Sequence, residues 1–308
     1  MTSSFSFDQK IDHNNFFQNV NQLRTMDTKP PRLTISELEN WLHEDAQYGD
    51  VTSEAIIPAT DKTKAVLRAR KSGIVAGIPI ISQVLDYLGI DYTIHINDGS
   101  NVVENDKILS LGGNTREILL IERLILNFLT HLSGIATQVA NMVAIVAKNN
   151  GTAKIAATRK TLPGLRKYQK YAVKIAGGAT HRFSLSDCLL IKDNHIQAAG
   201  NVSNALQLAL ENKDFTKRID IEVETMEDAL LAAEMGADII MLDNMQPEEI
   251  QLIHNALIDK GLRKKVILEI SGGINPANLK DYTSLPIDII SMGSLTHSVI
   301  ALDLGLDF

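Results

Sequence analysis

The sequence predicts an α/β protein in which a small mixed domain precedes an α/β barrel. Short apolar runs recur after residue 150, and each stops abruptly at charged, small or glycine residues. The stretches between these runs have mostly helical periodicity, as in EDALLAAEMG and PEEIQLIHNALIDKG. Buried parallel strands that alternate with helices are typical of an α/β barrel or of a doubly wound sheet.

The ends of the apolar runs favour the barrel. In a barrel, the C-terminal ends of all strands converge on one face, where active sites are built. A doubly wound sheet gathers only the strands beside its switch point. Six strands are clear in the sequence, and a seventh or eighth is not. The residues just past these six runs are Arg159 and Lys160, Lys192 and Asp193, Glu222 and Glu224, Asp243 and Asn244, Ser271 to Gly273, and Ser291 to Gly293.

An N-terminal extension and a first helix are expected before the mixed domain. Residues 1–32 are polar and close with Pro30-Pro31, which indicates a loosely held extension or a short added helix. The segment SELENWLHED then predicts a helix, with Ser36 as its N-cap and Glu39 completing a capping box.

Strands and a long helix are expected next. Residues 64–111 contain AVLRAR, GIVAGIP, YTIHIND and KILSLGG, which are short, partly alternating and punctuated by glycine. From about Thr115 to His131 the apolar period is that of a helix. The predicted apolar stripe of this helix is Leu119, Leu120, Leu124, Leu126, Phe128 and Leu129.

The composition argues against nucleic-acid and membrane partners. A formal net charge of −7 argues against nucleic-acid binding. The single cysteine, Cys188, excludes an intramolecular disulfide and fits a reducing cytoplasm, and the apolar run CLLI predicts an inert core thiol. No uninterrupted apolar run is long enough to span a bilayer, and the first residues lack the pattern of a secretory signal. We therefore expect a cytoplasmic protein with no membrane or nucleic-acid partner.

The glycines after the last two strands predict a phosphate site. These strands end in EISGGI and SMGS. Backbone amides without side chains can approach a phosphate closely, and barrels frequently bind phosphate with the loops after their last two strands. Either loop alone is better explained as an ordinary tight turn, but the pair favours a phosphate site.

Cationic residues are dense in the segment TRKTLPGLRKYQKYAVKIAGGATHR. A solvated helix face explains some of them; these are Lys167, Lys170 and Lys174. That explanation fails for the cations that the strand pattern puts at the barrel mouth, which are Arg159, Lys160 and Lys192. Several cations around one pocket imply a ligand with several negative charges.

Carboxylates face these cations from other strand ends. Glu222 and Asp243 are suited to hold magnesium, bind sugar hydroxyls or stabilise developing positive charge, and they also suit a role as counter-ions of the lysines. Together the residues point to a phosphorylated sugar. The histidines near strand or helix ends lack metal-ligand spacing and are expected to be hydrogen-bonded structural residues. They are His131, His195 and His297.

The motifs resemble those of the quinolinate phosphoribosyltransferases, also called carboxylating nicotinate-nucleotide pyrophosphorylases. The matching strings run in the family's order from about Glu44 to Ser298. They are EDAQYGDVTS, ERLILNFLTHLSGIAT, TRKTLPGLRKYQKYAV, GGATHRFSLSDCLLIKDNH, IEVE, LDNM, EISGGI and SMGSLTHS.

The resemblance implies an N-terminal α/β sandwich domain plus an incomplete, open α/β barrel. The polar extension would occupy residues 1–32. The sandwich domain would occupy residues 33–135 and include the C-terminal tail 297–308. The barrel would occupy residues 136–296.

The resemblance also implies roles for the site residues. The quinolinate pocket would be lined by Arg159, His181, Arg182 and Lys192. Lys160 would lie near the reacting groups and the pyrophosphate, and Glu222 and Asp243 would hold the ribose hydroxyls and magnesium. The 5-phosphate would be bound by Ser271, Gly272, Gly273 and Gly293. Arg123 would reach into the neighbouring subunit's site, so that the active unit would be a homodimer or a higher oligomer.

The activity implied by the resemblance is a phosphoribosyl transfer in NAD biosynthesis. Quinolinate and phosphoribosyl pyrophosphate would give nicotinate mononucleotide, carbon dioxide and pyrophosphate, with Mg²⁺ as cofactor. Three alternatives remain open on the residues alone: a related pyrophosphorylase or nicotinate phosphoribosyltransferase, a Schiff-base aldolase with Lys192 as nucleophile, and a non-catalytic binding protein. Asp193 opposes the aldolase, and no motif supports the binding protein.

Overall fold

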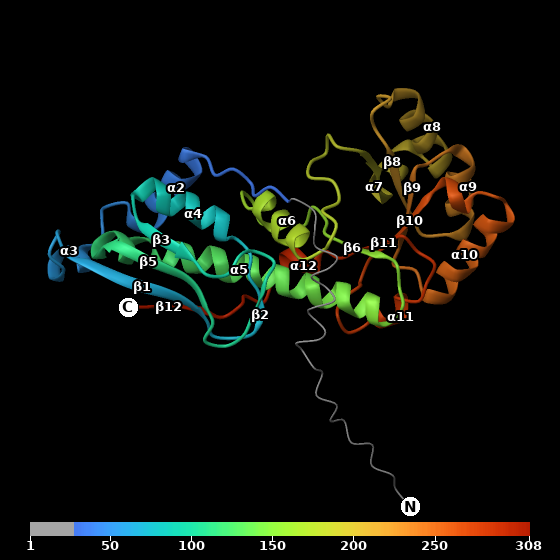
Figure 1. Ribbon diagram of the computed structural model, residues 1–308. Coiled ribbons are helices and arrows are strands. Elements are labelled where there is room, and N and C mark those ends of the chain that lie inside the picture. Colours follow the sequence, from blue (N-terminus) through green and yellow to red (C-terminus); the bar gives the residue numbers. More distant parts are fainter. Residues whose placement is uncertain (1–27) are drawn as a thin grey trace, which may run out of the picture.

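The protein is elongated, with a sheet domain at one end and a barrel domain at the other (Figure 1). The computed structural model describes residues 28–308, so most of the expected extension lies outside the described residues. Helix α5 (Thr115–Lys148) runs between the two ends and contacts elements of both. The domain boundary predicted between residues 135 and 136 therefore falls inside this helix, and the boundary stays a prediction.

The sheet domain is built on a four-stranded antiparallel sheet in the order β12-β1-β5-β3. Strand β12 comes from the C-terminal tail, so the end of the chain returns to the first domain. The elements are α2 (Ile35–Ala46), α3 (Val51–Ile56), β1 (Lys62–Ala69), β2 (Gly73–Ile74), α4 (Ile78–Leu88), β3 (Asp91–Ile94), β4 (Asn101–Val102), β5 (Lys107–Asn114) and β12 (Leu304–Asp307).

The barrel domain contains six parallel strands in the order β6-β11-β10-β9-β8-β7, which are the six strands that the sequence predicts. Strands β6 and β7 stand at opposite ends of this order, so the barrel is open and the expected fold class is confirmed. The strands are β6 (Lys154–Ala156), β7 (Leu189–Ile191), β8 (Ile219–Val223), β9 (Ile239–Asp243), β10 (Ile267–Ser271) and β11 (Ile289–Ser291).

Helices connect these strands, as expected for parallel pairing. Helices α8, α9 and α10 follow one another around the outside of the barrel, as Figure 1 shows. The helices are α6 (Arg166–Ile175), α7 (Asp193–Ala199), α8 (Val202–Asn212), α9 (Met226–Met235), α10 (Pro247–Asp259), η1 (Arg263–Lys265), α11 (Leu279–Tyr282) and α12 (Ser294–His297).

The predicted cap of the first helix is wrong by two residues. Helix α2 is capped by Thr34, whose Oγ1 accepts from the Glu37 amide at 3.2 Å while the Glu37 carboxylate accepts from the Thr34 amide at 3.0 Å. Both TISE and SELE have the spacing of a capping box. The tertiary structure selects the first, because Glu37 also pairs with Lys167 at 2.7 Å.

Helix α5 is longer than predicted and continues from His131 to Lys148. The small residues Ser133 and Gly134, which weaken a helix in isolation, lie where other segments cross it. Ser133 Oγ accepts from the Ala76 amide at 3.0 Å, and a Cβ on Gly134 would lie 3.0 Å from Ala301 Cα. Close packing against these segments thus accounts for the small residues at this point of the helix.

The buried face of α5 is also rotated from the predicted stripe. The second half of the predicted stripe, Leu126, Phe128 and Leu129, is buried as expected. In the first half, Leu119, Leu120 and Leu124 are half-buried, and Ile118, Ile121 and Ile125 are fully buried in their place. By length and composition α5 could cross a bilayer, contrary to the expectation from the sequence, with half of its most apolar window buried in the protein. Its contacts with α6, β2, β5 and β12 are those of a core helix.

Candidate active site

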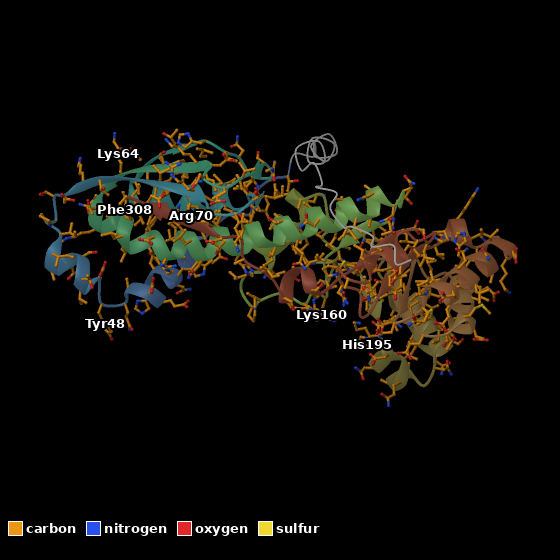
Figure 2. The ribbon with its side chains drawn as sticks, turned by 90° about the horizontal axis from the view of Figure 1, so that it is seen from below. Tyr48, Lys64, Arg70, Lys160, His195 and Phe308 are labelled. Atoms are coloured by element: carbon orange, nitrogen blue, oxygen red, sulfur yellow. The ribbon has the colours of Figure 1, made fainter. Side chains whose placement is uncertain are left out.

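A cavity of about 670 Å³ opens at the C-terminal ends of the barrel strands. It brings together the site residues predicted in the barrel domain, although they come from loops far apart in the sequence. Those residues are Arg159, Lys160, His181, Arg182, Lys192, Glu222, Asp243, Ser271, Gly272, Gly273 and Gly293. Figure 2 shows Lys160 and His195 in the barrel half of the molecule, away from Tyr48 and Lys64 of the sheet domain. The roles assigned to these residues remain predictions.

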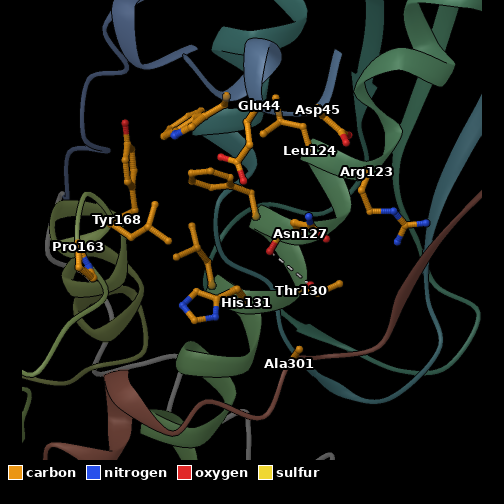
Figure 3. Close-up of a pocket in the computed structure, with 14 residues that line it drawn as sticks. Glu44, Asp45, Arg123, Leu124, Asn127, Thr130, His131, Pro163, Tyr168 and Ala301 are labelled. Atoms are coloured by element: carbon orange, nitrogen blue, oxygen red, sulfur yellow. Dashed lines mark hydrogen bonds between the residues drawn. The ribbon is translucent and has the colours of Figure 1, made fainter. Parts of the chain in front are cut away.

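Arg123 lies apart from that cavity. It lines a second cavity of about 680 Å³ between α2, α5 and α6, opposite Pro163 and Tyr168 (Figure 3). The Arg123 side chain is 64% exposed and approaches Glu122 at 3.9 Å. Within one chain it therefore does not join the other predicted residues, and its contribution to a neighbouring subunit stays a prediction.

The glycine loops bring backbone to the cavity wall. Gly272 has a φ of +87°, and a Cβ there would lie 2.6 Å from Asn244 Cγ and 2.8 Å from its backbone nitrogen. A Cβ on Gly293 would lie 2.7 Å from Lys160 Cδ. A side chain at Gly272 would thus collide with backbone at a positive φ, which leaves glycine as the fitting residue there, whereas at Gly293 it would displace the flexible Lys160 side chain.

Cations and carboxylates meet directly at the cavity wall. Lys192 Nζ donates to Glu222 Oε2, and the Glu222 side chain is 11% exposed. Burial and the neighbouring Glu222 raise the pKa of Asp243. Arg159 Nε is buried and has no hydrogen-bond partner among the described residues, which leaves a donor for a ligand.

Two buried carboxylates beside His181 were not predicted from the sequence. Asp220 on β8 and Glu269 on β10 are fully buried and lie 3.6 Å and 3.4 Å from His181 Nε2. Ser291 Oγ donates to Glu269. Each of these two acids is a charged residue in the middle of an apolar strand, RIDIEVE or VILEIS, and such residues are seldom fully buried unless they are paired, so this pattern is the signal that could have identified them.

These contacts set the protonation of the group. Burial would lower the pKa of His181, but Asp220 and Glu269 outweigh it and raise this pKa to about 9. Burial raises the pKa of Asp220 to about 6 against the opposing effect of His181. The Arg182 amide donates to His181 Nδ1 at 2.7 Å and favours the neutral ring, but one amide dipole is weaker than two buried carboxylates.

Contrary to the prediction from the sequence, Lys170 does not lie on a solvated helix face. Its side chain is fully buried, and its ammonium donates to the carbonyls of Thr180, at 2.6 Å, and Arg182. The prediction holds for Lys174, which is exposed, and only partly for Lys167, which pairs with Glu37.

The other polar candidates have local partners. Cys188 is half-buried rather than a core thiol, and burial raises its pKa, which disfavours the reactive thiolate. His131, His195 and His297 are hydrogen-bonded to Gln169, to the Lys192 amide and to Ser298 respectively, as expected. His297 also lines the barrel cavity, so its purely structural role stays a prediction.

Comparison with known proteins identifies the family. The profile of the quinolinate phosphoribosyl transferase N-terminal domain matches residues 50–133, and that of the C-terminal domain matches residues 135–307. The chain belongs to the quinolinate phosphoribosyltransferase family.

Individual members of the quinolinate phosphoribosyltransferase family match over nearly all of their length. A probable carboxylating nicotinate-nucleotide pyrophosphorylase of Methanocaldococcus jannaschii is 46% identical over 273 residues, 88% of this chain and 95% of that protein. The human carboxylating nicotinate-nucleotide pyrophosphorylase is 35% identical, covering 90% of this chain and 92% of that protein. The crystal structure of NadC from Streptococcus pyogenes has a TM-score of 0.82 at 36% identity, covering 89% of this chain and 96% of that chain.

Proposed function

We propose that the chain transfers the phosphoribosyl group of phosphoribosyl pyrophosphate to quinolinate. The products are nicotinate mononucleotide, carbon dioxide and pyrophosphate. The observation that carries this proposal is that one cavity is lined by cations, carboxylates and glycine loops together. A dicarboxylate beside a phosphorylated sugar fits this set of groups, and the family membership supports the same reaction.

The ribose step needs charge of both signs. The bond from the anomeric carbon to pyrophosphate breaks, and positive charge builds on the ribose, as in glycoside cleavage. Glu222 and Asp243 offset that charge, while Lys160 neutralises the departing pyrophosphate. The pyridine nitrogen of quinolinate supplies the electron pair for the new bond to carbon, so no covalent enzyme intermediate is required.

Decarboxylation follows from the charge on the ring. Once the pyridine nitrogen is alkylated it is positively charged and stabilises the carbanion left when the adjacent carboxylate departs as carbon dioxide. A proton then replaces the lost group. Arg159, Arg182 and Lys192 hold the carboxylates before this step as charge-assisted hydrogen-bond donors.

Magnesium fits the carboxylate side of the cavity. Asp243 has a raised pKa because it is buried near Glu222, and a divalent cation relieves such repulsion with oxygen ligands. Glu222 and Asp243 would hold the ion, directly or through water, and when bound it would neutralise the charge of the pyrophosphate. A cytoplasmic location remains part of the proposal, supported by the single cysteine.

The test is an incubation with quinolinate, phosphoribosyl pyrophosphate and magnesium, with nicotinate as the parallel substrate. We expect nicotinate mononucleotide and carbon dioxide in equal amounts from quinolinate and no product from nicotinate. Product from nicotinate alone would contradict the assignment of the cationic pocket to a dicarboxylate. Omitting magnesium tests the cofactor separately.

The Schiff-base aldolase is disfavoured by the contact of Lys192. Such an enzyme needs the lysine as a neutral amine in reach of a carbonyl, whereas Lys192 Nζ is bound to the Glu222 carboxylate. Failure of borohydride to trap an aldehyde on the chain would confirm this.

A further inference from the structure

Lys170 occupies an unusual environment for a lysine. It lies on α6 with its side chain fully buried, and within residues 28–308 no carboxylate comes within ion-pair distance of its ammonium. The ammonium is instead satisfied by the carbonyl oxygens of Thr180 and Arg182 and by the ring of Phe183, whose centroid is 5.0 Å from Nζ. Burying a charge in this way is costly, so a buried lysine without a counter-ion needs an explanation.

The two carbonyls that Lys170 binds flank His181. His181 has a φ of +52°, in the left-handed region that non-glycine residues rarely adopt. Because both carbonyls turn toward one ammonium, the peptide group before His181 and the peptide group after Arg182 are held, and the conformation between them is thereby restricted. The side chains of His181 and Arg182 then face the cavity, with His181 above Asp220 and Glu269.

We propose that Lys170 is a positioning residue that fixes the turn from Thr180 to Arg182 and thereby aims His181 and Arg182 at the dicarboxylate. This inference rests on the proposed function, since it assumes that these two side chains bind quinolinate. Lys170 itself touches neither substrate, because two protein carbonyls and an aromatic ring surround its ammonium.

The charges around Lys170 support a role beyond packing. Burial, together with Arg166, Arg159 and Arg182, lowers the pKa of Lys170 to about 8 against the opposing effect of Asp187. An apolar residue of the same length would avoid both the desolvation and this repulsion. Retaining a cation here therefore costs stability, which is expected where function requires the contact.

The test compares two variants with a matched control. Lys170→Met keeps the length of the side chain and removes the charge and the donors. Lys170→Gln keeps an amide donor and requires no buried charge. It replaces Lys170→Met in the test if the methionine variant does not fold. Lys174→Met, at an exposed position of the same helix, is the control. Each variant is assayed for the KM of quinolinate, the KM of phosphoribosyl pyrophosphate and kcat, and its fold is checked by thermal unfolding.

For Lys170→Met we expect the KM of quinolinate to rise at least about tenfold, with the KM of phosphoribosyl pyrophosphate changed less than about twofold. Lys170→Gln should lie between this variant and the wild type, and Lys174→Met should match the wild type. A folded Lys170 variant with an unchanged KM for quinolinate, or with both KM values raised equally, would overturn the positioning role.

The outcome of the wild type separates this inference from the proposed function. A wild type that turns over quinolinate while Lys170 variants keep its KM defeats only the inference. A wild type without turnover defeats the proposed function, and calorimetric titration with phthalate, a benzene dicarboxylate, then decides the inference. Loss of phthalate binding in the Lys170 variants but not in Lys174→Met would support it, and equal binding in all variants would overturn it.

Discussion

At the residue scale, buried charge is concentrated around His181, at the wall of the barrel cavity. Asp220 and Glu269 are fully buried, and neither oxygen of Asp220 has a hydrogen-bond partner among the described residues. One imidazole at 3.4–3.6 Å is the cation that compensates them. Removing the imidazole from this buried cluster would leave the carboxylate charge uncompensated, which is strongly destabilising.

The pH dependence of stability should report His181. Its pKa is raised to about 9 in the folded state, so its contribution is fully present below pH 6.5 and is lost as the pH rises through about 9. The stability advantage of the wild type over His181→Gln should therefore shrink by up to about 3 kcal/mol between about pH 6 and about pH 10. Urea unfolding across this range measures it, and a pH-independent difference would show that the ring is neutral when folded.

Gly272 should be required for the loop after β10. Gly272→Ala adds a Cβ that would lie 2.8 Å from the Asn244 backbone nitrogen, at a φ of +87°. We expect the KM of phosphoribosyl pyrophosphate to rise about tenfold or more, because the displaced loop is the predicted phosphate site. Gly261→Ala is the matched control, since Gly261 has a φ of +67° but open space around it. Equal effects of the two variants on this KM would contradict the argument.

At the element scale, α5 organises the molecule. It contacts the antiparallel sheet, the C-terminal strand β12 and the barrel strand β6. Trp41 of α2 and Tyr168 of α6 pack on Phe128 of α5 with ring centroids 4.5 Å and 5.4 Å away. One long helix thus fixes the barrel relative to the sheet domain, which is why its small residues matter as much as its apolar ones.

A substitution in α5 should reverse the usual helix propensity. Glycine to alanine inside a helix normally stabilises by about 1 kcal/mol. Gly134→Ala should instead lower the free energy of unfolding by about 1–3 kcal/mol, because its Cβ would overlap the Ile300 carbonyl and lie 3.0 Å from Ala301 Cα. Ala147→Gly, at an exposed position of the same helix, should show the ordinary loss of about 1 kcal/mol. Stabilisation by Gly134→Ala in urea unfolding would refute the close approach of the tail.

At the scale of the whole molecule, one predicted site residue lies outside the site of its own chain. Arg123 is exposed on α5 and lines the cavity next to α2 and α6, while the other predicted residues line the barrel cavity. In a symmetric dimer with one chain's α5 at the barrel of the other chain, Arg123 would lie beside the partner's barrel cavity. Two-fold symmetry would repeat this contact at both sites.

Mixing two inactive variants tests this arrangement. If Arg123 acts in the partner's site, Arg123→Ala and Lys160→Ala should each lose activity, and a refolded equal mixture should recover about a quarter of the wild-type activity. Half of the dimers would then be mixed, with one of their two sites intact. The same mixing of Lys160→Ala with Asp243→Ala, both in one barrel cavity, should recover none. An active Arg123→Ala variant, or a mixture that stays inactive, would argue against a shared site.

The sequence by itself determined the six barrel strands, their alternation with helices and the gathering of strand-end residues, because parallel strands bring their C-terminal ends to one face. The tertiary structure alone decided features that depend on contacts distant in sequence. Thr34 became the cap because Glu37 meets Lys167, α5 continued through Gly134 because the tail crosses there, and β12 joined the first sheet. Lys170 looked like a solvated lysine because its period on α6 cannot reveal which carbonyls will fold over it. A buried charge is tolerable only beside a suitable partner. The packed structure alone shows these partners, which are His181 for Asp220 and Glu269 and two backbone carbonyls for Lys170.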